Sequence, residues 1–196
     1  MKLLFLTKDD SKFDMMKEKL KDFKDLELIN PSVLGFTNEE EMPSIEKALN
    51  YHELTGLSTI ILNSGLYIDK FENKEQPELL RKKVNATETI KNYINNLNKH
   101  GGRSLAHYYS NISIINNDGI VTTNTINGNE FLLVNKEGKK VNLKGRLLDI
   151  ISIDLEAGKY FNDRNNEEIE THYKASYNEL IEFIKATLYK NEKVDN

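Results

Sequence analysis

The chain has 196 residues, of which 38% are hydrophobic and 30% are charged. These values are typical of a globular protein with one sizeable domain, or one domain with two lobes. The formal net charge of -4 argues against broad binding to nucleic acid or to a membrane surface, because both are anionic. The absence of cysteine excludes disulfides, zinc–thiolate sites and a cysteine nucleophile. The apolar run at the N-terminus is too short for a signal peptide, so we expect a cytoplasmic protein.

The first segment of the chain predicts a strand, a polar loop and a helix. Residues 2–7 are a short apolar run, and apolar residues recur at helical spacing from Phe13 onward. The opening turn of a helix offers free backbone N–H groups, and Thr7, Ser11 and Lys12 stand beside it, a combination suited to a phosphate. The alternative is that Ser11 or Asp10 only caps the helix.

The next segment predicts a short strand over residues 27–33, an acidic loop and a helix that starts at Pro43-Ser44 and runs to about residue 55. Glu46 lies in the first turn of that helix. An acid at this place is a candidate residue of a binding site. It is equally explained as a solvated side chain that the helix dipole favours.

The segment around residue 60 predicts the central strand of the fold. The apolar run at residues 59–62 ends in Asn63-Ser64-Gly65, which indicates a buried strand that delivers small polar residues to a turn. An α/β fold binds its ligand at such strand ends. The alternative is an ordinary loop.

The second half of the chain changes its periodicity. A long helix from about residue 84 is expected to end at His100-Gly101-Gly102. Hairpin signals then separate four short strands, at residues 110–115, 120–125, 130–134 and 140–143, in an antiparallel meander. An apolar segment at residues 147–155 closes on Asp154, a last amphipathic helix reaches residue 188, and the tail from 190 is polar. This order favours a single two-lobed α/β domain over residues 1–196, with a cleft between the lobes.

Five short motifs occur in a characteristic order. They are Thr7-x4-Lys12, Ser44-Ile45-Glu46-Lys47-Ala48, Asn63-Ser64-Gly65-Leu66, Ser152-Ile153-Asp154-Leu155 and Thr171-His172-Tyr173. In order, spacing and chain length they resemble the inosine triphosphatase family, whose members hydrolyse deaminated purine nucleoside triphosphates to the monophosphate and pyrophosphate. The resemblance covers nearly the whole chain. It implies a twisted mixed sheet flanked by helices, with a central nucleotide cleft.

The resemblance also implies roles for individual residues. In that family the first loop and its lysine hold the triphosphate, a helix glutamate and an Asp-Asp-Ser-Gly turn hold magnesium and activate water, and two later segments recognise the 6-keto purine. Carried over, the nucleotide-binding residues are Thr7, Ser11, Lys12, Asn63, Ser64, Gly65, Asp154, Thr171, His172 and Lys174, and the metal ligand is Glu46. His172 could equally be a structural histidine of the helix.

The departures from the family pattern concern chemistry most. Leu62 and Asn63 occupy the places of the two aspartates, so no catalytic residue is carried over. Leucine offers no ligand and asparagine offers only a neutral carbonyl, whereas magnesium prefers carboxylate oxygens. Any magnesium bound with the nucleotide would therefore have a weak site. Further differences are Asp9 for an asparagine, Tyr51 and Glu167 for lysines, and Tyr173 for the arginine that reads the base, which Lys174 could replace.

These observations leave three hypotheses. The first is a catalytically impaired sensor that binds ITP or dITP and regulates a partner, as in similar degenerate subunits of Kongming-type bacterial anti-phage defence, which pair with a sirtuin-like NADase. The second is an active pyrophosphatase in which Glu46, Asp69 or Glu72 replaces the missing carboxylates. The third is a scaffold subunit that keeps only the surface with which the family forms homodimers.

Overall fold

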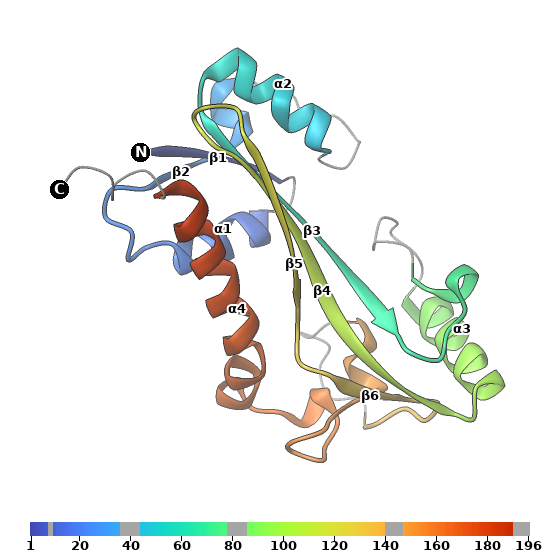
Figure 1. Ribbon diagram of the computed structural model, residues 1–196. Helices are drawn as coiled ribbons and strands as arrows, with labels where there is room; N and C mark the ends of the chain where they lie inside the picture. Colours follow the sequence, from blue (N-terminus) through green and yellow to red (C-terminus); the bar gives the residue numbers. More distant parts are fainter. Residues whose placement is uncertain (8–9, 36–43, 78–85, 140–146, 190–196) are drawn as a thin grey trace. The chain divides into compact units, whose positions relative to one another are not determined.

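The computed structural model describes residues 1–7, 10–35, 44–77, 86–139 and 147–189 (Figure 1). The chain forms two compact units. Unit 1 comprises Met1–Asn63, Ser110–Ile126 and Tyr177–Asn196, and unit 2 comprises Ser64–Tyr109 and Asn127–Ser176. The predicted strand at residues 140–143 and the predicted polar tail lie outside the described residues.

The described residues form strands, helices and short 3-10 helices. The strands are β1 (Lys2–Leu6), β2 (Glu27–Ile29), β3 (Ser58–Ile68), β4 (Arg103–Ile115), β5 (Val121–Asn127), β6 (Phe131–Val134) and β7 (Ser152–Asp154). The α-helices are α1 (Asp10–Lys19), α2 (Ile45–Thr55), α3 (Ala86–Lys99) and α4 (Asn166–Leu188). The 3-10 helices are η1 (Pro31–Leu34), η2 (Asn73–Glu75), η3 (Leu147–Ile150) and η4 (Phe161–Asp163).

The strands form a mixed sheet in the order β2-β1-β3-β4-β6-β7, and β5 pairs with β4. β1 runs parallel to both β2 and β3, whereas β6 is antiparallel to both β4 and β7. Helices flank the sheet. The predicted α/β class with a mixed sheet is therefore confirmed.

The core of unit 1 packs the parallel strands against helices from both ends of the chain. Phe5 of β1 and Ile60 of β3 share one apolar cluster with Met16 of α1 and with Leu180 and Ile184 of α4. All five side chains are buried. Apolar residues four apart lie on one face of a helix, so Leu180 and Ile184 reach this cluster together.

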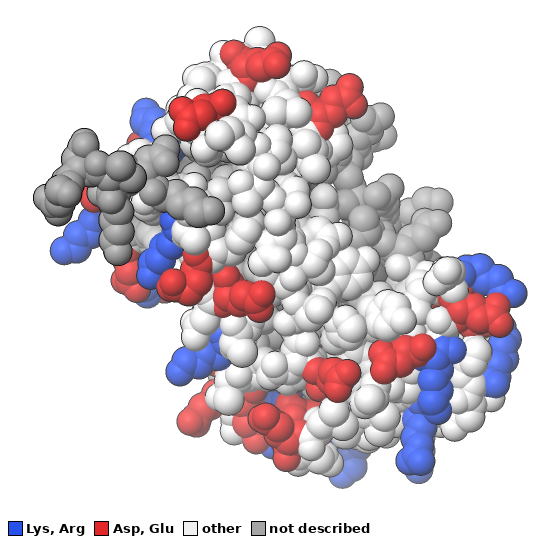
Figure 2. Space-filling view, in the orientation of Figure 1, with Lys and Arg blue, Asp and Glu red and all other residues white. Residues whose placement is uncertain are grey.

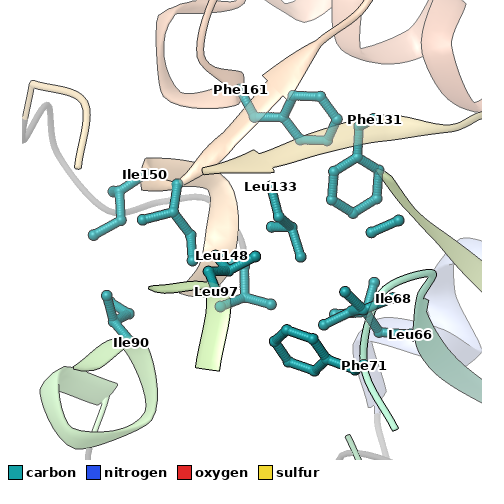
Figure 3. Close-up of a cluster of buried hydrophobic side chains, with 12 residues drawn as sticks. Leu66, Ile68, Phe71, Ile90, Leu97, Phe131, Leu133, Leu148, Ile150 and Phe161 are labelled. Carbon is teal, nitrogen blue, oxygen red and sulfur yellow. The ribbon is translucent and has the colours of Figure 1, made fainter. Parts of the chain in front are cut away.

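The core of unit 2 forms beneath the antiparallel strands. Its twelve buried members include Phe131 and Leu133 of β6, Leu97 of α3 and Phe161 of η4 (Figure 3). The rings of Phe131 and Phe161 lie 5.1 Å apart between centroids. Phe161 thereby fixes the segment that follows β7 to the sheet.

The helix ends confirm most of the capping signals in the sequence. The side chain of Ser44 accepts a hydrogen bond from the N–H of Lys47, and Gly56 ends α2 with a left-handed backbone. α3 ends at the predicted glycines. α4 begins at Asn166, because Asn165 and Glu168 exchange side-chain to backbone hydrogen bonds and so form a capping box.

Three strand predictions were wrong. β3 does not turn at Asn63-Ser64-Gly65 but continues to Ile68, since its pairing extends the strand through these small residues. The predicted strand at residues 27–33 stops at Ile29, where Asn30 caps a 3-10 helix that begins with Pro31. The meander is also incorrect, because β5 and β6 both pair with β4.

Asn127-Gly128 explains the error in the meander. The N–H of Gly128 donates to the carbonyl of Tyr108 in β4 at 2.7 Å, so the chain stays beside β4 instead of folding back on β5. A Cβ at Gly128 would lie 3.1 Å from that same carbonyl oxygen. Glycine therefore permits a close approach here rather than a hairpin turn.

Charged side chains of both signs are interspersed on the face shown in Figure 2. Among the described helices, none has the length and apolar character needed to cross a membrane.

Candidate functional site

The residues predicted to hold the triphosphate lie at the end of β1 and in the first turn of α1. The N–H of Thr7 donates to the carbonyl of Phe5 at 3.0 Å. α1 begins at Asp10, so Ser11 and Lys12 belong to the helix and not to the loop before it. Lys12 is half-buried, and Asp9 lies outside the described residues. The first turn of a helix attracts an anion, so this placement is compatible with the predicted phosphate contacts.

Glu46 lies in the first turn of α2, where its side chain is exposed. The helix dipole favours an acid there, so the place of Glu46 needs no metal to explain it. Within the described part of the chain, no group of three or more His, Cys, Asp or Glu side chains is placed to hold a metal ion. The described residues therefore do not fit a complete magnesium site, and Glu46 as a ligand stays a prediction.

Leu62 and Asn63 differ in their surroundings although they are neighbours in β3. Leu62 is 7% exposed and belongs to the apolar cluster of unit 1 with Phe5 and Ile60. Asn63 is half-buried, as expected from the alternation of side chains along a strand. Leu62, which the resemblance sets at the place of an aspartate, is thus part of the hydrophobic core.

Ser64 and Gly65 continue β3 into unit 2. Ser64 is half-buried and Gly65 is buried. A Cβ built on Gly65 would lie 2.4 Å from both Cζ and the hydroxyl oxygen of Tyr109. The phenol ring of Tyr109 therefore covers the backbone of Gly65.

Asp154 is the last residue of β7, and its carboxylate contacts every other member of a buried polar cluster in unit 2. Its Oδ1 accepts hydrogen bonds from the N–H groups of Glu156 and Ala157, at 2.9 and 3.2 Å. Its Oδ2 lies 3.1 Å from Nη1 of Arg164 and 3.5 Å from Nδ1 of His172. Burial raises the pKa of Asp154, but these hydrogen bonds and charges outweigh it, so the pKa lies below its usual value. Asp154 is therefore an ionised carboxylate near neutral pH.

Arg164 follows η4 and is buried with Asp154. The side chains of Arg164 and Asp154 are 2% and 6% exposed. The guanidinium carbon lies 3.5 Å from the centroid of the Phe161 ring and 5.9 Å from that of Tyr173. Nε of Arg164 is buried and has no hydrogen-bond partner among the described residues. The guanidinium is thus held by one carboxylate and two aromatic rings.

His172 lies inside α4, and its imidazole packs against the rings of Phe161 and Tyr173. Its imidazole makes edge contacts with Phe161 and Tyr173, at centroid distances of 5.0 and 4.9 Å. The amide of Asn129 donates to the main-chain carbonyl of His172 at 2.9 Å. The structure thus brings His172 and Asp154 together in unit 2, and nucleotide binding by the two residues stays a prediction.

The other residues predicted for base recognition lie outside this cluster. Thr171 and Lys174 are exposed on α4, and the hydroxyl of Thr171 donates to the carbonyl of Glu167 at 2.8 Å. Glu167 is itself exposed in the first turn of the helix. Arg164 forms the ion pair with Asp154. Lys174 as a nucleotide-binding residue stays a prediction.

The sequence prediction missed Arg164, Phe161 and Tyr109. Phe161 and Arg164 stand in the segment between Asp154 and the last helix, which the prediction left unassigned. An arginine three residues after a phenylalanine and directly before the capping Asn165 was the available signal. Nothing in the sequence indicated that Tyr109 covers Gly65, because the two residues lie on different strands.

A scan of protein-family models and a search of curated proteins found no match. Solved structures with a similar fold were found. The Ham1 protein of Staphylococcus aureus is 16% identical with a TM-score of 0.71, over 95% of this chain and 100% of that one. A HAM1 protein from Coxiella burnetii is 19% identical with a TM-score of 0.73, over 94% and 98%. A nucleoside-triphosphatase, described as a dITP/XTP pyrophosphatase, from Mycobacterium abscessus is 16% identical with a TM-score of 0.66, over 92% and 97%. The chain therefore has the Ham1 fold.

Proposed function

We propose that this chain, which shares the Ham1 fold over nearly its whole length, is an inosine-triphosphatase-like protein that binds ITP or dITP without hydrolysing it at an ordinary rate. Residues 1–196 would form one domain with two lobes, in the cytoplasm. The nucleotide-binding residues would be those named from the family pattern, with Lys12 at the phosphates and Asp154 and His172 at the base.

The observation that carries this proposal is the burial of Leu62. Phosphoryl transfer depends almost wholly on positioning and on neutralising charge, which in the similar family two aspartates achieve through magnesium. Leu62 is instead packed into the core of unit 1. Asn63 cannot act as a base at neutral pH. A chain that keeps Asp154 and His172 but lacks the two aspartates meets the need of a sensor, since hydrolysis would remove its signal.

The test combines binding with turnover. Purified protein is incubated with ITP, dITP or ATP, with magnesium, and both the melting temperature and pyrophosphate release are measured. We expect ITP and dITP to stabilise the protein, by about 2.7 kcal/mol at a hundredfold excess over Kd. ATP is the matched control and should stabilise it less. Failure of ITP and dITP to bind would refute the proposal.

Hydrolysis is the second candidate function, and the described similarity of the fold to a dITP/XTP pyrophosphatase favours it. The replacement carboxylates would be Glu46, Asp69 or Glu72, all of which are exposed. Glu72 forms an ion pair with Lys74 at 2.9 Å. Pyrophosphate release at roughly 1 per second or faster would select this function. A chain that neither binds nor hydrolyses would be the scaffold.

A sensor acts by changing the activity of a partner protein when it binds its ligand. We propose a homodimer or a complex with a sirtuin-like NADase, as in the degenerate relatives that the sequence resembles. A ligand shifts such a complex only through its differential affinity, so a tenfold change in partner activity requires about 1.4 kcal/mol of coupling. Measuring NAD loss by the co-purified pair with and without dITP tests this. Lys12→Ala should abolish the response by removing a phosphate anchor.

A further inference from the structure

The side-chain cluster around Asp154 contains more positive charge than the carboxylate can neutralise if His172 is protonated. Arg164 and His172 approach the same oxygen, Oδ2, at 3.1 and 3.5 Å. Oδ1 is already taken by two backbone N–H groups. A guanidinium stays charged in proteins, so Arg164 remains ion-paired with the carboxylate of Asp154 at every pH at which that carboxylate is ionised. The guanidinium repels a second cation at the same oxygen, and this repulsion offsets the attraction between the carboxylate and a protonated imidazole.

Folding stability alone does not explain a buried arginine here. Nε of Arg164 has no partner among the described residues, and an unsatisfied buried donor is unfavourable. A buried ion pair is often replaceable by apolar residues without loss of stability. The neighbouring rings of Phe161 and Tyr173 would accept such an apolar side chain. The charge of Arg164 therefore calls for another role.

We propose that Arg164 is a positioning residue, whose guanidinium fixes the carboxylate of Asp154 and shares it with His172, so that the imidazole meets the ligand as a neutral ring. The role in ligand binding rests on the proposed function. A neutral imidazole has one N–H and one lone pair, so it can distinguish donors from acceptors on a base edge, whereas an imidazolium only donates.

Tyr173, Glu168 and Lys159 are other charged or titratable residues that the described part of the chain brings near this cluster. Tyr173 contacts the imidazole ring edge-on. Glu168 lies at the start of α4, and its pKa is lowered mainly by Lys159 and also by the charge of Arg164. Glu168 is paired with Lys159 at 2.6 Å. Lys159 approaches Asp154 only through its main-chain carbonyl, which accepts the N–H of Asp154. Lys159→Met therefore removes a neighbouring cation without removing the partner of the carboxylate, and it is the matched control for Arg164→Met.

The experiment follows the imidazole of His172 by NMR from pH 5 to 9 in the ligand-free protein. In Arg164→Met the repulsion from the guanidinium is removed and the attraction of the Asp154 carboxylate remains. The titration midpoint of the His172 imidazole should therefore rise by about one pH unit or more. Arg164→Lys should restore most of the original midpoint, and Lys159→Met should leave it unchanged. An unchanged midpoint in folded Arg164→Met would overturn the proposal. If that variant does not fold, the titration midpoint of His172 is measured in Arg164→Gln, with the same rise expected.

Ligand affinity is measured in parallel. Arg164→Met should weaken ITP binding about tenfold at pH 7.5 and make it pH-dependent where the wild type is not. If the wild type does not bind ITP, the proposed function fails, and the midpoint in Arg164→Met still decides whether Arg164 controls His172. A lower melting temperature with unchanged midpoint and affinity would show that Arg164 is only structural.

Discussion

The phenol ring of Tyr109 lies against the backbone of Gly65, and a Cβ at Gly65 would fall 2.4 Å from the ring. Gly65→Ala should therefore displace the ring and cost about 1–3 kcal/mol of unfolding free energy. In a Tyr109→Leu background the same change should cost much less, because the clashing atoms are gone. A double-mutant cycle by urea unfolding measures this coupling. Equal costs in both backgrounds would contradict the contact.

Leu62→Asp should destabilise the protein by several kcal/mol, because it places an unpaired carboxylate in the apolar cluster of unit 1. Asn63→Asp should be tolerated, since Asn63 is half-buried. Urea unfolding of both single variants tests the difference. The two changes together should not restore pyrophosphate release unless the strand end remains folded. Equal stability of the two single variants would show that Leu62 is not a core residue.

Asp154→Asn should destabilise the protein by roughly 3–5 kcal/mol, because Arg164 would be left buried without a counter-charge. The new amide would also present N–H donors to Arg164 and His172. The control is Glu156→Gln, an exposed neighbour that bonds Asp154 only through its main chain. The folded pKa of Asp154 is lowered, so its contribution is present above about pH 4 and is lost as the pH falls through the folded value. The variant and wild type should therefore converge in acid.

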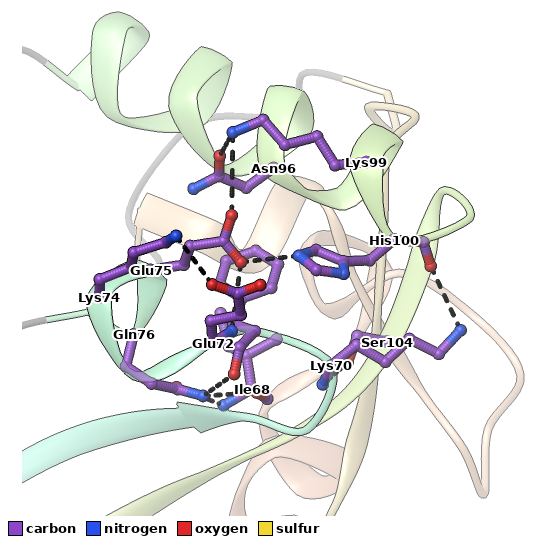
Figure 4. Close-up of polar contacts among 11 residues, drawn as sticks. Ile68, Lys70, Glu72, Lys74, Glu75, Gln76, Asn96, Lys99, His100 and Ser104 are labelled. Carbon is purple, nitrogen blue, oxygen red and sulfur yellow. Dashed lines mark hydrogen bonds and ion pairs between the residues drawn. The ribbon is translucent and has the colours of Figure 1, made fainter.

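Glu75 and His100 form a second pH-sensitive pair in unit 2, with Nε2 of His100 2.7 Å from Oε2 of Glu75 (Figure 4). This hydrogen bond, helped by the N–H of Glu72, lowers the pKa of Glu75. The pair should stabilise the protein above the ordinary glutamate pKa of about 4.3 and lose that effect as the pH falls further. Unfolding of Glu75→Gln at several pH values checks this. Glu182→Gln, which breaks an exposed pair with Lys185, should show a much smaller effect.

His172→Gln should weaken ITP binding about ten- to a hundredfold and leave ATP binding nearly unchanged, if His172 reads the base. Glutamine is preferable to alanine, because the imidazole fills space between Phe161 and Tyr173. Lys185→Ala, on an exposed part of the same helix, is the control. Calorimetric titration with both nucleotides measures the ratio. The same ITP-to-ATP ratio in the variant would remove His172 from the site.

Local signals in the sequence predicted the parts of this structure that local chemistry determines. Ser44 and Gly56 delimit α2 because a cap and a left-handed glycine act on their own helix. The small polar residues of β3 misled the prediction, since pairing with neighbouring strands overrides a turn signal. The family pattern named Asp154 and His172 as separate nucleotide-binding residues, and that role stays a prediction. Arg164 was not named, because its pairing depends on how η4 folds back over β7.

β1 and the second half of α4 share one apolar cluster, although they stand at opposite ends of the chain. At about 5–20 residues per second, a ribosome needs on the order of 10–40 s to pass from β1 to Ile184. β1 can pair with β2 and β3 in the meantime, but the side chains of Leu3 and Phe5 stay incompletely covered. Unit 1 therefore completes its core only after Ile184 has been synthesised, and we expect the apolar side chains of β1 to need protection from aggregation until then.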